Sequence, residues 1–356
     1  MHETPILIVG NGLAACHLAW QLRGAGSPVR MIGNTSQGCA SEVAAGVLNP
    51  VTGKRLARSW RVETLLPFAR GCYRALEKEL GIHCLHELEI RRYCLDERDV
   101  KTHAERTGDP AYASFLGPLE APGSGPDGIV DEFGSFIIRQ VGYVDLPTLL
   151  GAMRGALHAA GAYTEETFAY GDLTVEPDLI RYRGERFAAL VFCEGNGIAV
   201  NPWFDWLPFR PVKGEILTVR SGEIDLPPAI YHHRKWILPL GDGQFRIGST
   251  YERGDHDPQP TEAGRQELLA GLQSVFTDAK SVEVVEHRAG IRPCTRDTRP
   301  YLGCHPEHPA LLVLNGLGAK GALLAPWLSR HLLEHLRHGK AIDPELDCVR
   351  YAPLRP

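Results

Sequence analysis

The sequence of 356 residues contains no block of lysines and arginines, and its net charge is −5. Nucleic acids and membrane surfaces are usually bound through clustered basic residues, so we expect neither kind of partner. Long apolar runs are also absent. The most apolar stretch, residues 310–333, is broken by Asn315, three glycines, Lys320 and Pro326. Because a bilayer-spanning helix needs about 20 nearly uninterrupted apolar residues, we expect no membrane span.

Paired cysteines are lacking as well. The nine cysteines are an odd number and none form a CxxC pair, which is typical of reduced thiols rather than of a disulfide framework. The histidines beside Cys84, and the pair His232 and His233, lack the spacing of zinc ligands, so we expect no metal. The five residues before Ile6 leave no room for a signal peptide, which predicts a cytoplasmic location.

The length exceeds what one hydrophobic core usually fills, which predicts two domains. Short apolar runs predict buried parallel strands at 5–9, 29–32, 188–192 and 311–314. Helical spacing with caps or terminal glycines predicts helices at 13–24, 63–80, 145–161, 261–276 and 321–337. Alternating runs between residues 216 and 251 predict antiparallel strands, whereas residues 108–136 read as loops with short strands.

A glycine turn joins the first predicted strand to the first predicted helix. Gly10, Gly12, Leu13, Ala14 and Ala15 belong to a segment that fits G-x-G-x-x-G/A. The first glycine permits the tight turn, the second lets the backbone approach a diphosphate, and the small third residue lets helix and strand pack closely. A lone match is weak, but its place inside a βαβ unit of about 30 residues favours a nucleotide site over a structural turn.

An expected acid is missing from this unit. The second strand of such a unit usually ends in Asp or Glu, which binds the ribose hydroxyls of the adenosine. Gly33 stands there instead, followed by Asn34 and Ser36, which offer neutral hydrogen bonds. The replacement predicts a weaker hold on the adenosine than a charge-assisted bond would give.

Six further segments, in this order along the chain, resemble the D-amino-acid oxidase superfamily of flavoproteins, and within it the bacterial glycine oxidases. They are Ala40–Gly46, Gly142–Asp145, Pro211–Glu215, Ile247–Tyr251, Ala289–Pro293 with Asp297, Pro300 and Gly303, and Asn315–Gly321. The C-terminal pair is the most specific, because the first reads like the family's GxRPxTxDxxPxxG and the second like its flavin-closing glycine loop. The resemblance extends from about Ile6 to about Leu336.

The resemblance implies an α/β fold with a discontinuous, Rossmann-like FAD-binding domain and an antiparallel-sheet substrate domain. The expected FAD-binding domain comprises residues 1–80, 145–205 and 288–356, and the substrate (cap) domain comprises 81–144 and 206–287. Gly290 stands where some family members carry the cysteine that links the flavin, so we expect non-covalent FAD.

The resemblance also assigns cofactor contacts beyond the glycine turn. Ala45 and Gly46 are expected beside the flavin ring, and the loop after the last strand at its far edge. Phe168 is expected to offer backbone groups to the adenine. The complete predicted cofactor set is Gly10, Gly12, Leu13, Ala14, Ala15, Asn34, Ala45, Gly46, Phe168, Gly195, Arg292, Gly316, Gly318, Ala319, Lys320 and Gly321.

Arg292 is the predicted substrate anchor. The look-alike proteins place an arginine at this point of the motif on the substrate carboxylate, and a guanidinium suits a carboxylate because its planar donors match both oxygens. The alternative is a structural salt bridge to Asp297 or a neighbour. Trp236, Arg234 and Tyr251 are predicted to line the same pocket, where they depart from glycine oxidase; the two aromatic residues have a core role as their alternative.

These assignments predict an FAD-dependent oxidoreductase that oxidises a small amino acid or secondary amine. Hydride transfer from the alpha carbon to flavin N5 would give an imine, with oxygen or another electron acceptor reoxidising the flavin. Three alternatives stay open: a flavin dehydrogenase of a 2-hydroxy acid, a flavoprotein acting on modified tRNA, and a non-catalytic protein that has lost its cofactor. The sequence also leaves open whether the protein is a homo-oligomer.

Overall fold

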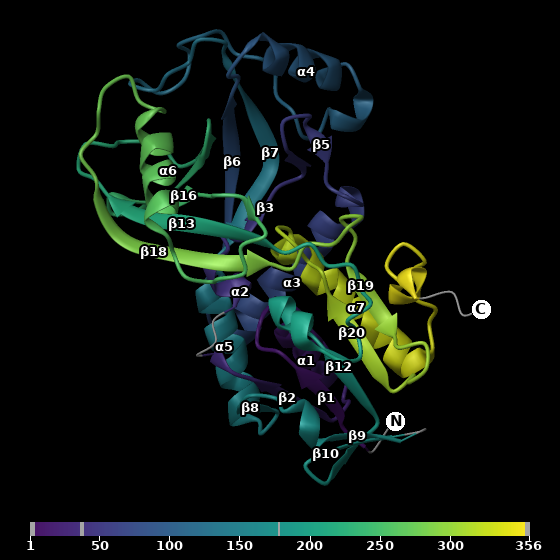
Figure 1. Cartoon of the computed structure of the whole chain (residues 1–356). Coiled ribbons are helices and arrows are strands. Elements are labelled where there is room, and N and C mark those ends of the chain that lie inside the picture. The colour runs from purple at the N-terminus through teal and green to yellow at the C-terminus, as the bar shows by residue number, and fades with distance from the viewer. Residues whose placement is uncertain (1–3, 36–38, 177–178, 353–356) are drawn as a thin grey trace.

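Two sheets, one parallel and one antiparallel, dominate the molecule (Figure 1). The structure is a computed structural model that describes residues 4–35, 39–176 and 179–352. The smaller sheet occupies the lower half of Figure 1 and the larger one the upper half. Among the described residues, no helix is long and apolar enough to cross a bilayer.

The lower sheet has six strands in the order β19-β20-β12-β1-β2-β8. Their bounds are β1 Ile6–Val9, β2 Val29–Gly33, β8 Tyr163–Glu165, β12 Ala189–Phe192, β19 Tyr301–Cys304 and β20 Leu311–Asn315. The pairs from β20 to β8 are all parallel, and β19 joins the edge in the antiparallel sense. Strand β1 is buried at all four positions, as its unbroken apolar sequence predicts for a strand covered on both faces.

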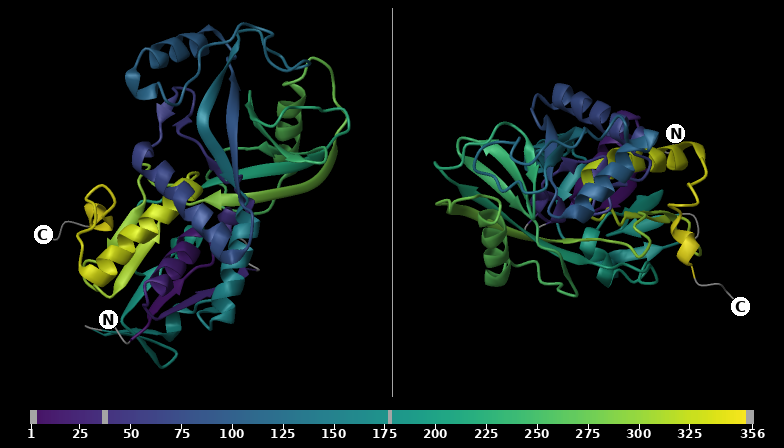
Figure 2. Two further views of the ribbon diagram at one scale, coloured as in Figure 1. Left: turned by 180° about the vertical axis from the view of Figure 1, so that it is seen from behind. Right: turned by 90° about the horizontal axis from the view of Figure 1, so that it is seen from above.

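Helices cover this sheet. Figure 2, left, shows α1 and α7 side by side in front of it, and α5 also packs against α1. The bounds are α1 Leu13–Gly24, α3 Val62–Leu80, α5 Leu146–Ala159 and α7 Gly321–His338. Asp145 caps α5 through a bond from the Thr148 N–H, and α3 ends at Gly81 in a left-handed conformation, so both predicted caps are confirmed.

The upper sheet has nine strands in the order β17-β13-β16-β15-β14-β6-β7-β3, and β18 pairs with β13 beside them. Their bounds are β3 Val47–Leu48, β6 Leu85–Tyr93, β7 Ser135–Val144, β13 Val212–Arg220, β14 Ile230–His232, β15 Trp236–Gly241, β16 Gln244–Gly248, β17 Glu252–Arg253 and β18 Glu283–Arg292. Neighbouring pairs are antiparallel except β14 with β6.

Shorter elements complete the fold. They are α2 Ala40–Val43, α4 Glu97–Thr107, α6 Glu262–Gln273, the strands β4 Val51–Thr52, β5 Ala57–Arg58, β9 Leu173–Val175, β10 Ile180–Tyr182 and β11 Glu185–Phe187, and short 3₁₀ turns, of which η4 Gly195–Val200 borders the site. Helix α6 packs on β13 and β16.

The predicted α/β fold class is confirmed by these two sheets. The division into domains stays a prediction, and two strands lie across its limits. Strand β3 comes from the first predicted FAD-binding segment but joins the upper sheet, and β18 runs through the predicted boundary at residue 288.

His17 is buried in α1 against the ring of Tyr73, at 5.6 Å between ring centroids. Burial lowers the pKa of His17 to about 3. Between that value and the ordinary histidine pKa of about 6.5, the unfolded chain binds a proton that the folded protein does not. The free energy of unfolding therefore falls as pH falls through this window.

We expect His17→Gln to reduce the slope of unfolding free energy against pH by about 1 kcal/mol per pH unit within the window. Urea unfolding of the wild type and the variant at several pH values below about 6.5 measures the two slopes. His158→Gln, which changes an exposed histidine at the end of α5, is the control. Equal slopes for His17→Gln and the wild type would contradict the expectation.

Candidate active site

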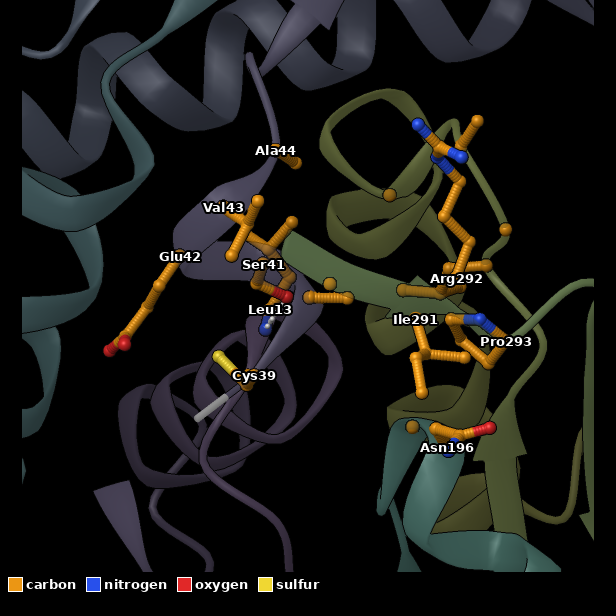
Figure 3. A pocket seen from close by; sticks show the side chains of 18 of the residues that line it. Leu13, Cys39, Ser41, Glu42, Val43, Ala44, Asn196, Ile291, Arg292 and Pro293 are labelled. Atoms are coloured by element: carbon orange, nitrogen blue, oxygen red, sulfur yellow. Dashed lines mark hydrogen bonds between the residues drawn. The ribbon is translucent and has the colours of Figure 1, made fainter. Parts of the chain in front are cut away.

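A cavity of about 1270 Å³ lies where the two sheets meet. One wall consists of the carboxyl ends of β1, β2, β12 and β20, and the other is a face of the upper sheet. Figure 3 shows the segment Cys39–Ala44 on one side of this space, and Ile291–Pro293 with Asn196 on the other. Ligands of open parallel sheets bind beyond the carboxyl ends of the strands, so the position suits a cofactor site.

Most of the predicted site residues line this cavity. They are Gly10, Gly12, Leu13, Ala14, Asn34, Ala45, Gly46, Phe168, Gly195, Trp236, Tyr251, Arg292, Gly318, Ala319, Lys320 and Gly321. Three others do not line it. Ala15 is fully buried inside α1, Gly316 lies against Thr295, and Arg234 is exposed between β14 and β15. Ser36 lies outside the described residues.

The turn before α1 presents its backbone to the cavity. The N–H of Gly10 donates to the carbonyl of Ile32 at 2.8 Å, which fixes the turn against the end of β2. The N-cap residue of α1 is Gly12, which has no side chain to cap the helix. The N–H of Leu13 donates to Ser41 Oγ, from a neighbouring segment, at 3.2 Å. A helix N-terminus whose own N-cap residue supplies no side chain, at the end of a buried strand, is a site for an anionic group such as a diphosphate.

The structure leaves no room for a side chain at position 33, where the residue is Gly33. A Cβ at this position would come within 2.7 Å of Asn11 Cβ and 2.8 Å of the carbonyl carbon of Gly10. The acid that usually ends the second strand is therefore excluded by the glycine turn beside it. Asn11 itself is buried, and its Nδ2 has no hydrogen-bond partner among the described residues.

Two more unsatisfied polar atoms border the same end of the cavity. Glu166 follows β8, and Asn196 lies in η4 after β12. Oε1 of Glu166 and Oδ1 of Asn196 are both buried without a partner in the described part of the chain. The other carboxylate oxygen of Glu166 lies 3.3 Å from Nη1 of Arg183. Because unsatisfied buried polar groups are costly, these atoms together with Asn11 Nδ2 indicate a polar ligand here.

Asn34 and Phe168 lie at this end as well. The Asn34 side chain donates to Thr167 Oγ1 at 2.8 Å, beyond β8. Phe168 stacks on Tyr182, with ring centroids 4.6 Å apart. Glu194 is buried there too and accepts bonds from the Tyr170 hydroxyl at 2.5 Å and from Asn201 at 2.8 Å. Burial raises the pKa of Glu194, and the two bonds offset part of that rise.

Arg292 ends β18 on the opposite wall. Its Nη2 donates to Ser249 Oγ at 2.8 Å, and its Nη1 donates to the Lys213 carbonyl at 3.3 Å. The guanidinium lies over Gly214, where any Cβ would overlap it. The guanidinium of Arg292 can therefore occupy this position only because the residue of β13 below it is a glycine.

The proposed salt bridge between Arg292 and Asp297 is wrong. Asp297 pairs with Arg350 at 3.1 Å, and among the described residues no carboxylate forms an ion pair with Arg292. Burial lowers the pKa of Arg292, and nearby Cys294 and Tyr251 offset part of this effect. A half-buried guanidinium held only by neutral oxygens is a site for an anion.

Aromatic residues flank this guanidinium. The ring of Tyr251 lies 5.9 Å from the central carbon of the guanidinium, within cation–π range. The indole of Trp236 covers Gly248, which again leaves no room for a side chain below it. Tyr251 is 61% exposed, so the alternative of a core role is wrong for this residue. Trp236 is half-buried and lines the cavity.

The start of α7 closes the cavity from the third side. Lys320 Nζ donates to Ser59 Oγ at 3.2 Å. Burial lowers the pKa of Lys320, and the positive charge of Arg299 adds to that effect. Gly290 also borders the cavity, where a Cβ would approach Ala40 and Val43 at 3.3 Å.

The family model described as DAO, FAD dependent oxidoreductase, matches residues 5–335. The chain belongs to this family. Glycine oxidase of Bacillus licheniformis is 27% identical over 338 residues, which cover 90% of this chain and 89% of that protein. The crystal structure of glycine oxidase from Geobacillus kaustophilus matches this DAO-family chain with a TM-score of 0.80 at 24% identity, over 99% of this chain and 100% of that one.

A relative with a different activity in its name also matches this DAO-family protein. It is the tRNA 5-methylaminomethyl-2-thiouridine biosynthesis bifunctional protein of Azoarcus sp. (strain BH72), which is 24% identical over an alignment of 387 residues. The alignment covers 98% of this chain and 59% of that protein.

The protein is thus an FAD-dependent oxidoreductase, and the cavity fits FAD. The start of α1 would hold the diphosphate. Asn11, Glu166 and Asn196 would hold the adenosine end through the atoms that lack partners. Arg292 and Lys320 border the part left for the flavin ring and the substrate. That FAD binds non-covalently stays a prediction.

The sequence did not reveal several of these residues. Asn11 and Glu166 have ordinary polar identities, and only the crowding at Gly33 shows why a carboxylate from the next strand is needed. Two further residues of the upper sheet that line the cavity, Arg92 and His232, were also missed. Both residues lie in or beside strands, and for Arg92 the available signal was the alternating run Leu85–Tyr93, which predicts a strand and contains Arg92 near its end.

We expect Glu166→Gln to weaken FAD binding by about tenfold or more, because hydrogen bonds to a carboxylate are stronger than those to a neutral amide. The quenching of flavin fluorescence on titration of the apoprotein measures the dissociation constant. FMN, which has no adenosine, should bind the variant and the wild type alike.

Glu165→Gln is the matched control, because Glu165 is an exposed neighbour that bonds to Thr35 and does not line the cavity. Unchanged FAD affinity in Glu166→Gln, or equal losses of FAD and FMN affinity, would contradict the assignment.

Proposed function

We propose that this oxidoreductase oxidises a small amino acid or secondary amine that carries a carboxylate. The observation that supports this best is the Arg292 guanidinium, which is half-buried at the cavity wall without an acid partner in the described residues. A substrate carboxylate would supply the missing charge and accept two parallel hydrogen bonds. The glycine oxidases among the relatives act on an amino acid by name, which agrees with this proposal.

Bound FAD would accept the hydride that leaves the alpha carbon of the substrate. Arg292 would fix the carboxylate and thereby the direction of the alpha carbon. The indole of Trp236 would exclude water from one side of the substrate, and the exposed ring of Tyr251 would cover the guanidinium from solvent. Water would then hydrolyse the imine product.

Two histidines of the described residues, His232 and His256, line the cavity. Burial lowers the pKa of His232 to about 4. A neutral substrate amine needs no protein base, because its lone pair assists the departure of the hydride. Positioning and charge placement would carry the catalysis.

A second candidate is oxidation of an amine on a modified tRNA. The relative from Azoarcus supports it, because its alignment includes 98% of this chain. The net charge of −5 argues against it, because RNA binding depends on cations that neutralise phosphates. A complex with tRNA that weakens steeply as salt is raised would favour this candidate.

The direct test of the proposal is an anaerobic screen of amino, imino and hydroxy acids with the holoprotein. We expect amino or imino acids to bleach the flavin absorbance, followed by recovery when oxygen or an artificial acceptor is added. Bleaching by 2-hydroxy acids alone would reject the proposal in favour of a hydroxy-acid dehydrogenase. The rate of recovery in oxygen separates an oxidase from a dehydrogenase.

We expect Arg292→Ala to lower kcat/KM on the carboxylate substrate by about 30-fold to a few thousand-fold, or about 2–5 kcal/mol, because one partner of a buried charge pair is lost. The kcat/KM of Arg292→Lys should lie between those of the wild type and Arg292→Ala, since lysine keeps the charge but not the paired donors. Steady-state kinetics on the best substrate of the screen measure the loss.

Arg253→Ala is the matched control, because Arg253 is an exposed arginine whose guanidinium carbon lies 5.7 Å from the centroid of the Tyr251 ring. It should change kcat/KM less than threefold. Wild-type kinetics in Arg292→Ala would assign Arg292 a purely structural role.

A further inference from the structure

A second guanidinium, more deeply buried than that of Arg292, lines the same cavity. Arg92 lies near the end of β6, is 6% exposed, and donates from Nη1 to the carbonyl of Gly53 at 2.9 Å. Among the described residues, no carboxylate forms an ion pair with it. Burial lowers the pKa of Arg92, and the negative charge of Asp99 offsets only part of that effect.

Several other cations with little exposure pair with an acid within the described residues. Lys213 bonds to Asp255 at 2.7 Å, Arg154 to Glu42 at 2.6 Å, and Arg350 to Asp297 at 3.1 Å. Arg91, the neighbour of Arg92, pairs with Glu120 at 2.5 Å. Since an unpaired buried charge costs several kcal/mol, a cation left without a partner at a cavity wall points to an anion from outside the chain.

The register of the upper sheet places Arg92 on the substrate side of the cavity. Arg92 pairs with His232, His232 with Trp236, and Trp236 with Gly248 across β6, β14, β15 and β16. Ser249, which binds Arg292, follows Gly248 directly. The two guanidiniums therefore approach one continuous wall from its two ends.

No acid from the upper sheet lines this wall. Next to Arg92 it is apolar, with Ile90, Ile138 and Ile230, and His232 is neutral near pH 7 because burial lowers its pKa to about 4. The acidic side chains that line the cavity come from the side of the lower sheet, and they are Glu42, Glu166 and Glu194. The charge of Arg92 is therefore not compensated on its own wall.

We propose that Arg92 forms a second anion subsite, and that the substrate is an amino acid with a second carboxylate or equivalent anionic group. The first carboxylate binds Arg292, and the inference rests on the amino-acid oxidation proposed above. Arg92 and Gly248 are three strand spacings apart, which is about 15 Å between backbones. That span favours an extended diacid, whose two anionic groups are separated by a chain of several atoms.

Inert acids test the subsite without any reaction. The holoprotein is titrated with straight-chain dicarboxylates from malonate to adipate and with monocarboxylates of matched length, and the shift of the flavin absorbance gives each dissociation constant. We expect the longer dicarboxylates to bind about 10- to 100-fold more tightly than their matched monocarboxylates.

The matched variants are Arg92→Gln, Arg92→Lys and Arg91→Gln. Arg92→Gln should bring the ratio of the two dissociation constants close to one, Arg92→Lys should keep part of the preference, and Arg91→Gln should keep all of it. Equal affinities for both acids in the wild type would overturn the proposal, and this measurement needs no variant to fold. A preference that survives Arg92→Gln would overturn it as well.

Substrate pairs separate this inference from the proposed function. Anaerobic flavin bleaching is followed with glutamate against glutamine and aspartate against asparagine, in both enantiomers, and with N-carboxymethyl derivatives of such pairs. Bleaching that favours the diacids supports both ideas, and bleaching without such a preference overturns the subsite alone. Tight binding of inert diacids without bleaching by any amine would support the subsite and reject amine oxidation.

Discussion

The guanidinium of Arg292 lies above Gly214 and is held by Ser249 and by backbone carbonyls, none of which carries a full charge. Its partial burial without a counter-charge is unfavourable, and a bound anion would offset that cost. Strand β18 brings this group from the upper sheet to the ends of the lower one, because it pairs with β13 as far as Val212. In the proposed reaction, the position of the substrate and the direction of its alpha carbon would depend on this contact.

Much of the lower sheet could be predicted from the sequence. The β1–α1–β2 unit, β12, β20 and α7 have unbroken apolar runs or helical spacing, which are local signals. Strands β6 and β7 and helix α4 were not predicted. Leu85–Tyr93 carries many charged residues, because one face of β6 is partly exposed while the other meets the core. Residues 108–136 do form mainly loops, as predicted.

The residues of the site also fall into those that local sequence signals could locate and those that they could not. Backbone requirements appear in the sequence as glycines, so the turn at Gly10, the α7 loop and Arg292 in its motif could be located. Side chains that meet only through the sheet register could not. The position of Arg234 was inferred by counting along a strand, and the tight turn after His232 directs it to solvent. Arg92 lies in a distant segment, and pairing between β6 and β14 alone brings it to the cavity.

The crowding around Gly33 also limits how the protein can change over evolutionary time. An acid at this position would collide with both Asn11 and the backbone of Gly10, so no single substitution could restore the common ribose-binding residue. The turn at Gly10 would have to shift before an acid could fit at position 33. A shifted turn without that acid would have lost the contact between Asn11 and Gly33. The effects of substitutions at positions 11, 33 and 166 on adenosine binding should therefore be strongly non-additive.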